Sequence, residues 1–263
     1  MYTHTSSHSK QIFLSKQVEP LFKSTRSGGI GNIIAALLVY LILRDTPLSA
    51  SAAYLTTAIT IISVIRIVLS AQYLKNKDHL KKYLYSHLAL TFIIGSLWGI
   101  YAYIHLNTGD ETLRNQVLLI NFGLIAGSIA TLSTWMLSYL AYMLPQSIAI
   151  FYIFLNADAN YNIYVAIAFP IFILIMIMTG LTFNRNHKNE VELKLNNKQL
   201  INDLNNEIDI REQVQLELEH NKQGLEKKVK ERTQELVDIN ISLEKVIDKK
   251  EQAEQDLQYL AYH

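Results

Sequence analysis

Few residues of this sequence could do chemistry, and the most informative are polar or helix-distorting side chains set within long apolar stretches. They are Arg66, Trp98, Asn121, Pro145 and Gln146. A polar group that faces lipid is costly, so we expect these side chains to face other helices. They could line a pocket for a small amphiphilic ligand, or hydrogen bonds between them could simply hold the helices together. For Arg66, two further options are extension of the side chain to the membrane surface and contact with an anionic lipid.

Other chemistries lack the residues that they need. The apolar stretches contain no lysine for a retinal Schiff base and no Asp or Glu for proton-coupled transport. His87 and His105 are about 27 Å apart along one helix at 1.5 Å per residue, too far to share a haem, so we interpret both as side chains at the membrane interface. The chain has no cysteine for disulfides or thiolate metal sites. We therefore expect no metal, cofactor or catalytic residue in this chain.

The elements that must position these residues are six membrane spans. Each is near the roughly 20 residues that cross a hydrocarbon core, and they cover residues 28–44, 51–73, 86–105, 115–136, 138–156 and 161–183. Lysines and arginines gather before the first span, between the second and third, and after the sixth. By the positive-inside rule, both termini should be cytoplasmic. We thus expect a six-helix transmembrane sensor domain over residues 28–184, with connections outside the membrane too short to form another domain.

Two further patterns concern the packing of this domain. Residues 1–27 form a cytoplasmic segment in which Leu14, Val18, Leu21 and Phe22 recur at helical spacing among lysines. This segment could be a helix lying on the inner leaflet, or a basic flank that only fixes the topology. GSLWG at 95–99 and GLIAG at 123–127 each place two glycines four residues apart, a spacing that favours close packing of a neighbouring helix.

Residues 185–263 are predicted to form a cytoplasmic signalling coiled coil. With Ile201 at position a of a heptad repeat, thirteen of the eighteen a and d positions from there to Leu260 are apolar. The clearest seam residues are Val229, Leu236, Ile239, Leu243, Val246, Leu257 and Leu260. A single helix cannot bury such a seam, so we expect the chain to associate with itself. Leucine at a with Ile or Val at d favours more than two strands, whereas the charged seam residues favour two.

The segment LEKKVKERTQELVDINISLEKVIDKKEQAEQDLQYLAYH, residues 225–263, resembles the linker of GGDEF-type diguanylate cyclases. In that family, a charged coil with a phrase like ERTQEL runs into LQYLAYHD and then LTxLxNR, which opens the catalytic domain. The six spans, with LRDTPLSA, GSLWG and LPQS, are similar to input domains found on such cyclases and on some sensor kinases. The resemblance implies a bacterial inner-membrane receptor whose cyclase domain would follow residue 263.

The resemblance also implies a mechanism. Diguanylate cyclases join two GTP molecules where two catalytic domains meet, so a parallel dimeric coil would control output. GTP and Mg²⁺ would bind only the output domain, because this chain has no GGDEF loop. The fold class expected is all-α, a polytopic membrane protein with six transmembrane helices followed by a long parallel coiled coil. Its expected partners are a second copy, membrane lipids and a small amphiphilic ligand.

Two other functions stay open. The chain could be the input module of a sensor histidine kinase, although neither His220 nor His263 is followed by the residues of a phosphoacceptor motif. It could also be a stand-alone membrane scaffold or channel assembled by its coil. A nucleic-acid binder is not expected, because the net charge is only +1.

Overall fold

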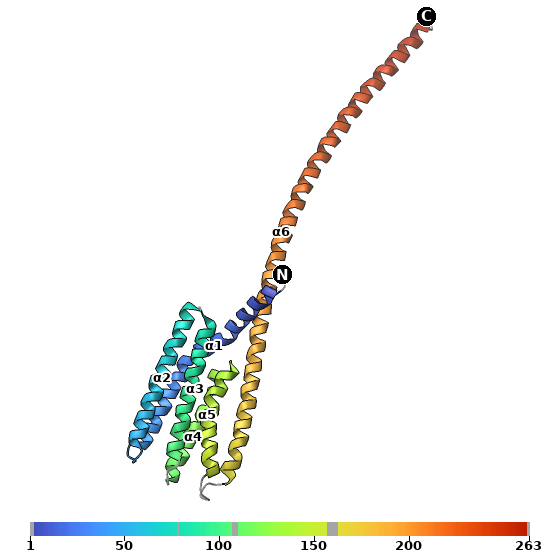
Figure 1. Ribbon diagram of the computed structural model, residues 1–263. Coiled ribbons are helices and arrows are strands. Elements are labelled where there is room, and N and C mark those ends of the chain that lie inside the picture. Colours follow the sequence, from blue (N-terminus) through green and yellow to red (C-terminus); the bar gives the residue numbers. More distant parts are fainter. Residues whose placement is uncertain (1–2, 78, 107–109, 157–162, 262–263) are drawn as a thin grey trace. The chain divides into compact units, whose positions relative to one another are not determined.

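The computed structural model describes residues 3–77, 79–106, 110–156 and 163–261 and is helical almost throughout (Figure 1). No strand occurs in these ranges. The helices are α1 Thr3–Leu43, α2 Ser49–Asn76, α3 Leu80–Leu106, α4 Glu111–Leu132, α5 Met136–Asn156 and α6 Ile163–Ala261. All six are long and apolar enough to cross a membrane. The prediction of an all-α, multi-pass membrane protein that ends in a long helix is therefore confirmed.

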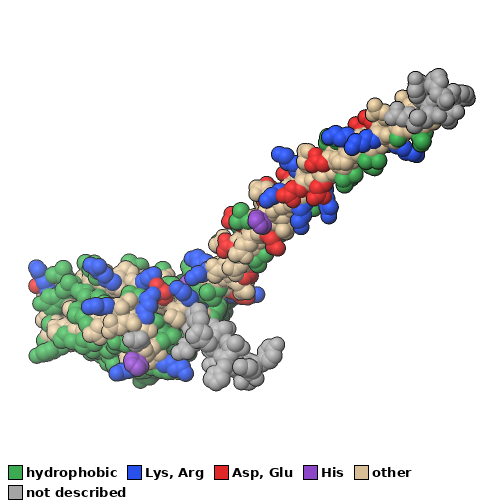
Figure 2. Space-filling model, turned by 90° about the horizontal axis from the view of Figure 1, so that it is seen from above, with side chains coloured by type: hydrophobic (Ala, Val, Ile, Leu, Met, Phe, Trp, Pro, Cys, Tyr) green, Lys and Arg blue, Asp and Glu red, His purple; other side chains and the backbone are tan. Residues whose placement is uncertain are grey.

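The described chain divides into two compact units, Met1–Leu195 and Asn196–His263. In the first unit, α3 packs against α5 and α2, and α1 packs against α2 and α4. Helix α6 contributes its first part to this unit. The second unit is the remainder of α6, along which every described side chain is exposed. Figure 2 shows acidic and basic side chains along that surface, whereas much of the bundle surface is hydrophobic.

Local interactions define where two of the helices begin and end. Asp110 is the N-cap of α4, and its carboxylate accepts hydrogen bonds from the backbone N–H groups of Thr112 at 2.8 Å and Leu113 at 3.1 Å. Helix α2 ends at Lys77, which has a left-handed backbone with φ 53° and donates its N–H to the carbonyl of Tyr73 at 2.7 Å. That cap turns the chain toward α3 without a glycine.

The polar segment before the first predicted span is continuous with it in α1. Val18, Leu21 and Phe22 are buried, and the ring of Phe22 lies 4.2 Å from that of Tyr73 in α2. On the same turn, Glu19 forms ion pairs with Lys23 at 2.8 Å and Lys77 at 3.7 Å. Along these residues, α1 packs on the other helices of the bundle.

The two glycine pairs have different surroundings. A Cβ on Gly95 would lie 2.4 Å from the Tyr142 carbonyl oxygen, and one on Gly99 would lie 2.9 Å from that of Pro145, so α3 and α5 touch backbone to backbone. The packing prediction is confirmed for this pair. It is wrong for Gly123 and Gly127, where a Cβ would meet no atom within 4 Å. These two glycines border open space instead.

Candidate ligand-binding site

Arg66 is the only arginine or lysine of the described chain that is fully buried, with 1% of its surface exposed. Its Nη1 donates to the Oγ1 of Thr91 at 3.3 Å, whereas its Nε has no hydrogen-bond partner. Among the described residues it forms no ion pair. A guanidinium carries five N–H donors and a charge that is costly to remove from water. Arg66 is thus enclosed in the bundle rather than extended to the surface, with donor capacity left over.

Asn32 of α1 connects three helices beside Arg66. Its Oδ1 accepts from Trp98 Nε1 on α3 at 2.8 Å and from the Tyr142 hydroxyl on α5 at 2.9 Å. Its Nδ2 donates to the carbonyl of Gly28 at 2.8 Å. Sequence reasoning singled out Trp98 but missed Asn32 and Tyr142. Asn32 could have been identified from the sequence because it is an amide within an apolar span, as Asn121 is.

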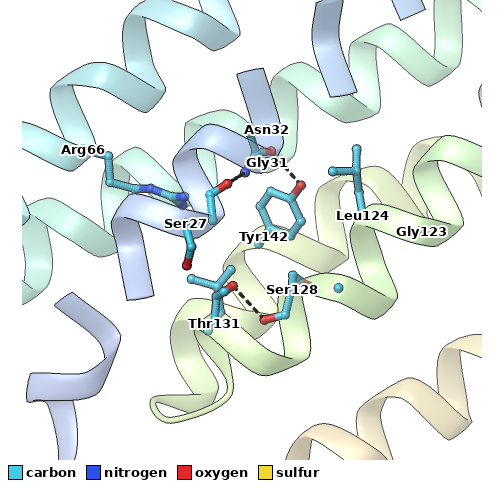
Figure 3. Close-up of a pocket in the computed structure, with 12 residues that line it drawn as sticks. Ser27, Gly31, Asn32, Arg66, Gly123, Leu124, Ser128, Thr131 and Tyr142 are labelled. Atoms are coloured by element: carbon cyan, nitrogen blue, oxygen red, sulfur yellow. Dashed lines mark hydrogen bonds between the residues drawn. The ribbon is translucent and has the colours of Figure 1, made fainter. Parts of the chain in front are cut away.

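A cavity of about 240 Å³ lies between these helices (Figure 3). Its wall is formed by α1 and α4, with Arg66 entering from α2 and Tyr142 from α5. The lining residues are Ser27, Gly28, Gly31, Asn32, Arg66, Gly123, Leu124, Gly127, Ser128, Thr131, Leu132 and Tyr142. The second predicted glycine pair therefore belongs to the cavity wall, where the absence of side chains leaves the space open.

The five residues singled out from the sequence fall into two groups in the structure, those at the cavity and those away from it. Arg66 lines the cavity, and Trp98 reaches it through Asn32. The other three, Asn121, Pro145 and Gln146, do not line it.

The two amides hydrogen-bond within their own helices. Asn121 Nδ2 donates to the carbonyl of Val117 at 2.9 Å, and Gln146 Nε2 donates to that of Tyr142 at 2.8 Å. Their side-chain oxygens have no partner among the described residues. These hydrogen bonds therefore do not join one helix to another, and Pro145 presents its carbonyl to Gly99.

Both histidines of the third span are buried by protein. His87 Nε2 is 3.0 Å from the Oγ1 of Thr25, and its Nδ1 is 3.4 Å from that of Thr91. His105 Nδ1 is 3.0 Å from the carbonyl oxygen of Tyr101. The described residues contain no cluster of His, Asp and Glu suited to a metal ion. The two histidines act as hydrogen-bonding core residues.

Helix α6 is hydrogen-bonded to the turn that follows the cavity wall. Asn184 Nδ2 donates to the carbonyls of Ser133 and Thr134, each at 2.8 Å, in the turn between α4 and α5. Gln17 of α1 donates to the same Thr134 carbonyl at 3.2 Å. Thr131, one turn earlier, lines the cavity. The last turn of α4 therefore lines the cavity, and the residues that directly follow it hold α6.

The predicted coil seam is exposed in this single chain. Its described residues at 229, 236, 239, 243, 246 and 257 are all exposed, and the side chain of Leu260 lies outside the described residues. The four charged seam residues each have an acidic partner on the same helix. The pairs are Arg211 with Glu207, Lys222 with Glu226, Arg232 with Glu235, and Lys250 with Glu254.

Comparison with known proteins adds no relative. No protein-family model, curated protein or solved structure matches the chain.

Proposed function

We propose that this chain is the membrane-embedded sensory input and dimerisation module of a bacterial inner-membrane receptor whose output is a C-terminal diguanylate cyclase. The resemblance of residues 225–263 to cyclase linkers supports the output, and the positions of the lysines and arginines support cytoplasmic termini. The main support for signal transmission is that Asn184 attaches α6 to the turn beside the cavity. It gives a ligand in the bundle a direct contact path to the helix that leads to the coil.

Dimerisation follows from the exposed seam of the coil. Leucine, isoleucine and valine side chains gain about 1.5–3 kcal/mol each when fully buried, so the exposed seam of one chain favours pairing with that of a second. The ion pairs on each helix reduce the penalty of the charged seam positions. Their acidic partners, Glu207, Glu226, Glu235 and Glu254, stand at the e and g positions, which flank the seam in a parallel pair.

Signal transmission would begin at the last turn of α4. A ligand that contacts Thr131 or Ser128 would shift the carbonyls of Ser133 and Thr134, to which Asn184 donates. Helix α6 would respond with a change of rotation or register, because the two hydrogen bonds of Asn184 are among those that hold it against the bundle. The coil would then bring the two catalytic domains together or hold them apart.

The test is cyclic di-GMP production from GTP and Mg²⁺ by the complete gene product in nanodiscs. Inserting one residue after Gly224 should change the output strongly, whereas inserting seven should preserve it, because seven residues restore the heptad phase. A Cβ at Gly224 would meet no atom. The ion pair between Lys222 and Glu226 spans the insertion point and is lost in both variants, so the two insertions differ in heptad phase and not in this contact. Equal activity of the two insertion variants would refute transmission through the coil, and absence of cyclic di-GMP from an intact dimer would refute the cyclase output.

Asn184→Leu tests the path from the cavity. This variant should keep the dimer and the basal activity but lose most of the response to a ligand, since the amide that joins α6 to the turn is gone. Thr179→Leu is a matched control, because the hydroxyl of Thr179 bonds only to the carbonyl of Ile175 on its own helix. An undiminished response of Asn184→Leu would show that the signal takes another route.

A further inference from the structure

We infer that the cavity beside Arg66 binds the anionic headgroup of an amphiphile, a carboxylate or phosphate carried on an alkyl chain. The inference deepens the proposed function, on which it rests for its biological meaning, by naming the ligand class. Binding is measured on the chain alone, so a failure here is distinct from a failure of the cyclase output.

The charge of Arg66 favours an anion in the cavity. Arg66 is 1% exposed and lines the cavity, its Nε is unpartnered, and its described neighbours provide no carboxylate. A buried cation without a counter-ion is unfavourable, and a planar guanidinium matches the geometry of carboxylate and phosphate oxygens. His87, also buried nearby against Thr91, supplies no negative charge either. An anion in the cavity would supply the missing partner.

The polarity of the lining residues changes along the cavity. The hydroxyl residues Ser128 and Thr131 lie in the last turns of α4 and line the cavity together with Arg66 and Ser27, whereas Leu124 and Gly123 lie further toward the middle of that helix (Figure 3). A headgroup next to the hydroxyls would therefore be followed by an apolar path for an alkyl chain.

The cavity is accessible from the surface of the bundle. The lining residues Gly31, Gly123 and Gly127 are exposed, so the cavity opens at the outer surface of the bundle between α1 and α4, where membrane lipid would lie. A volume of about 240 Å³ is below the roughly 300–1,000 Å³ of sites that enclose a drug-sized molecule. The cavity therefore suits a headgroup whose chain remains at the surface of the bundle.

The experiment uses the indole of Trp98 as a reporter, because it donates to Asn32 in the cavity wall. The chain has two tryptophans, so a Trp135→Phe background leaves one. In nanodiscs of zwitterionic lipid, dodecyl phosphate and dodecanoate are titrated beside dodecanol, which lacks the charge, and inorganic phosphate, which lacks the chain. Saturable changes of emission are expected with at least one of the two anionic amphiphiles, and no saturable change with dodecanol or inorganic phosphate.

Variants locate the site. Arg66→Gln should weaken binding at least tenfold, and Arg44→Gln, which alters an exposed arginine paired with Asp45, should not. Gly127→Leu keeps Arg66 but fills space that is open in the cavity wall, so it should also weaken binding, even if Arg66→Gln fails to fold.

The source of the headgroup is resolved by a further arm in which part of the zwitterionic lipid is replaced by phosphatidylglycerol. Competition with dodecyl phosphate would identify a membrane phospholipid as the amphiphile, whereas binding of dodecanoate without such competition would identify a free fatty acid. Either result supports the inference. Equal binding of dodecanol, equal binding of inorganic phosphate, or unchanged binding in both Arg66→Gln and Gly127→Leu would overturn it.

Discussion

The contact between α3 and α5 gives the sharpest test of the packing, through Gly95→Ala. The added Cβ would lie 2.4 Å from the Tyr142 carbonyl oxygen and 2.9 Å from the carbonyl carbon and Cα of the same residue. An ordinary contact begins near 3.4 Å, so the two helices must separate by roughly 1 Å. The neighbour is backbone and cannot rotate away. Overpacking of this kind typically costs about 1–3 kcal/mol.

The displacement would also reach the cavity, since Tyr142 carries the hydroxyl that donates to Asn32. Gly123→Ala is the matched control: it is the same substitution in a membrane helix, at a site where a Cβ would meet no atom. In a domain of this size, each kcal/mol corresponds to about 2–4 °C in the unfolding midpoint. Gly95→Ala should therefore unfold about 2–12 °C below the wild type, and Gly123→Ala close to it.

The assay is thermal unfolding of the purified chain in one detergent, followed by tryptophan emission and by recovery of monodisperse protein after heating. If Gly95→Ala and Gly123→Ala unfold at the same temperature, the backbone contact between α3 and α5 is refuted. A loss of stability confined to Gly123→Ala would in addition contradict the open space assigned to the cavity wall.

Three other changes test separate interactions. Trp98→Phe removes one of two donors to Asn32 and should lower the free energy of unfolding by about 1 kcal/mol in chemical denaturation; no change would mean that the indole bond is dispensable. Glu19→Gln removes the ion pairs with Lys23, Lys77 and Lys16 and should cost about 1 kcal/mol, a difference that shrinks at about 1 M salt; a cost independent of salt would point to packing. Arg232→Leu replaces a charged d residue and should tighten self-association in sedimentation of the full chain; an equal gain from leucine at an outer position of the same helix would argue against the seam.

The sequence was sufficient to predict the helices, because length and hydropathy decide whether a segment can span a membrane. It was less informative about which faces meet. GSLWG and GLIAG have the same spacing, yet one touches a neighbouring backbone and the other borders a cavity. The rotation of each helix about its axis distinguishes them, and that depends on all the neighbours at once.

The candidate site shows the same limit. Arg66 could be singled out because a charge is rare within a span, and Trp98 because of its size and its N–H group. Asn121 was equally conspicuous but bonds within its own helix, whereas Asn32 accepts from two others. Asn184 lies at the polar end of its span, where an amide attracts no notice. Only its two bonds to the turn reveal a role.

The acceptance of two donors by Asn32 has an evolutionary consequence. Asparagine and aspartate have nearly the same shape, and the oxygen that receives Trp98 and Tyr142 would be retained in Asn32→Asp. The exchange would place a carboxylate in the same cavity as Arg66 and cancel its unpaired charge. Related proteins could thus inherit the same helices and the same packing yet lose the preference for anions through one substitution. In such a bundle, ligand choice can diverge faster than architecture.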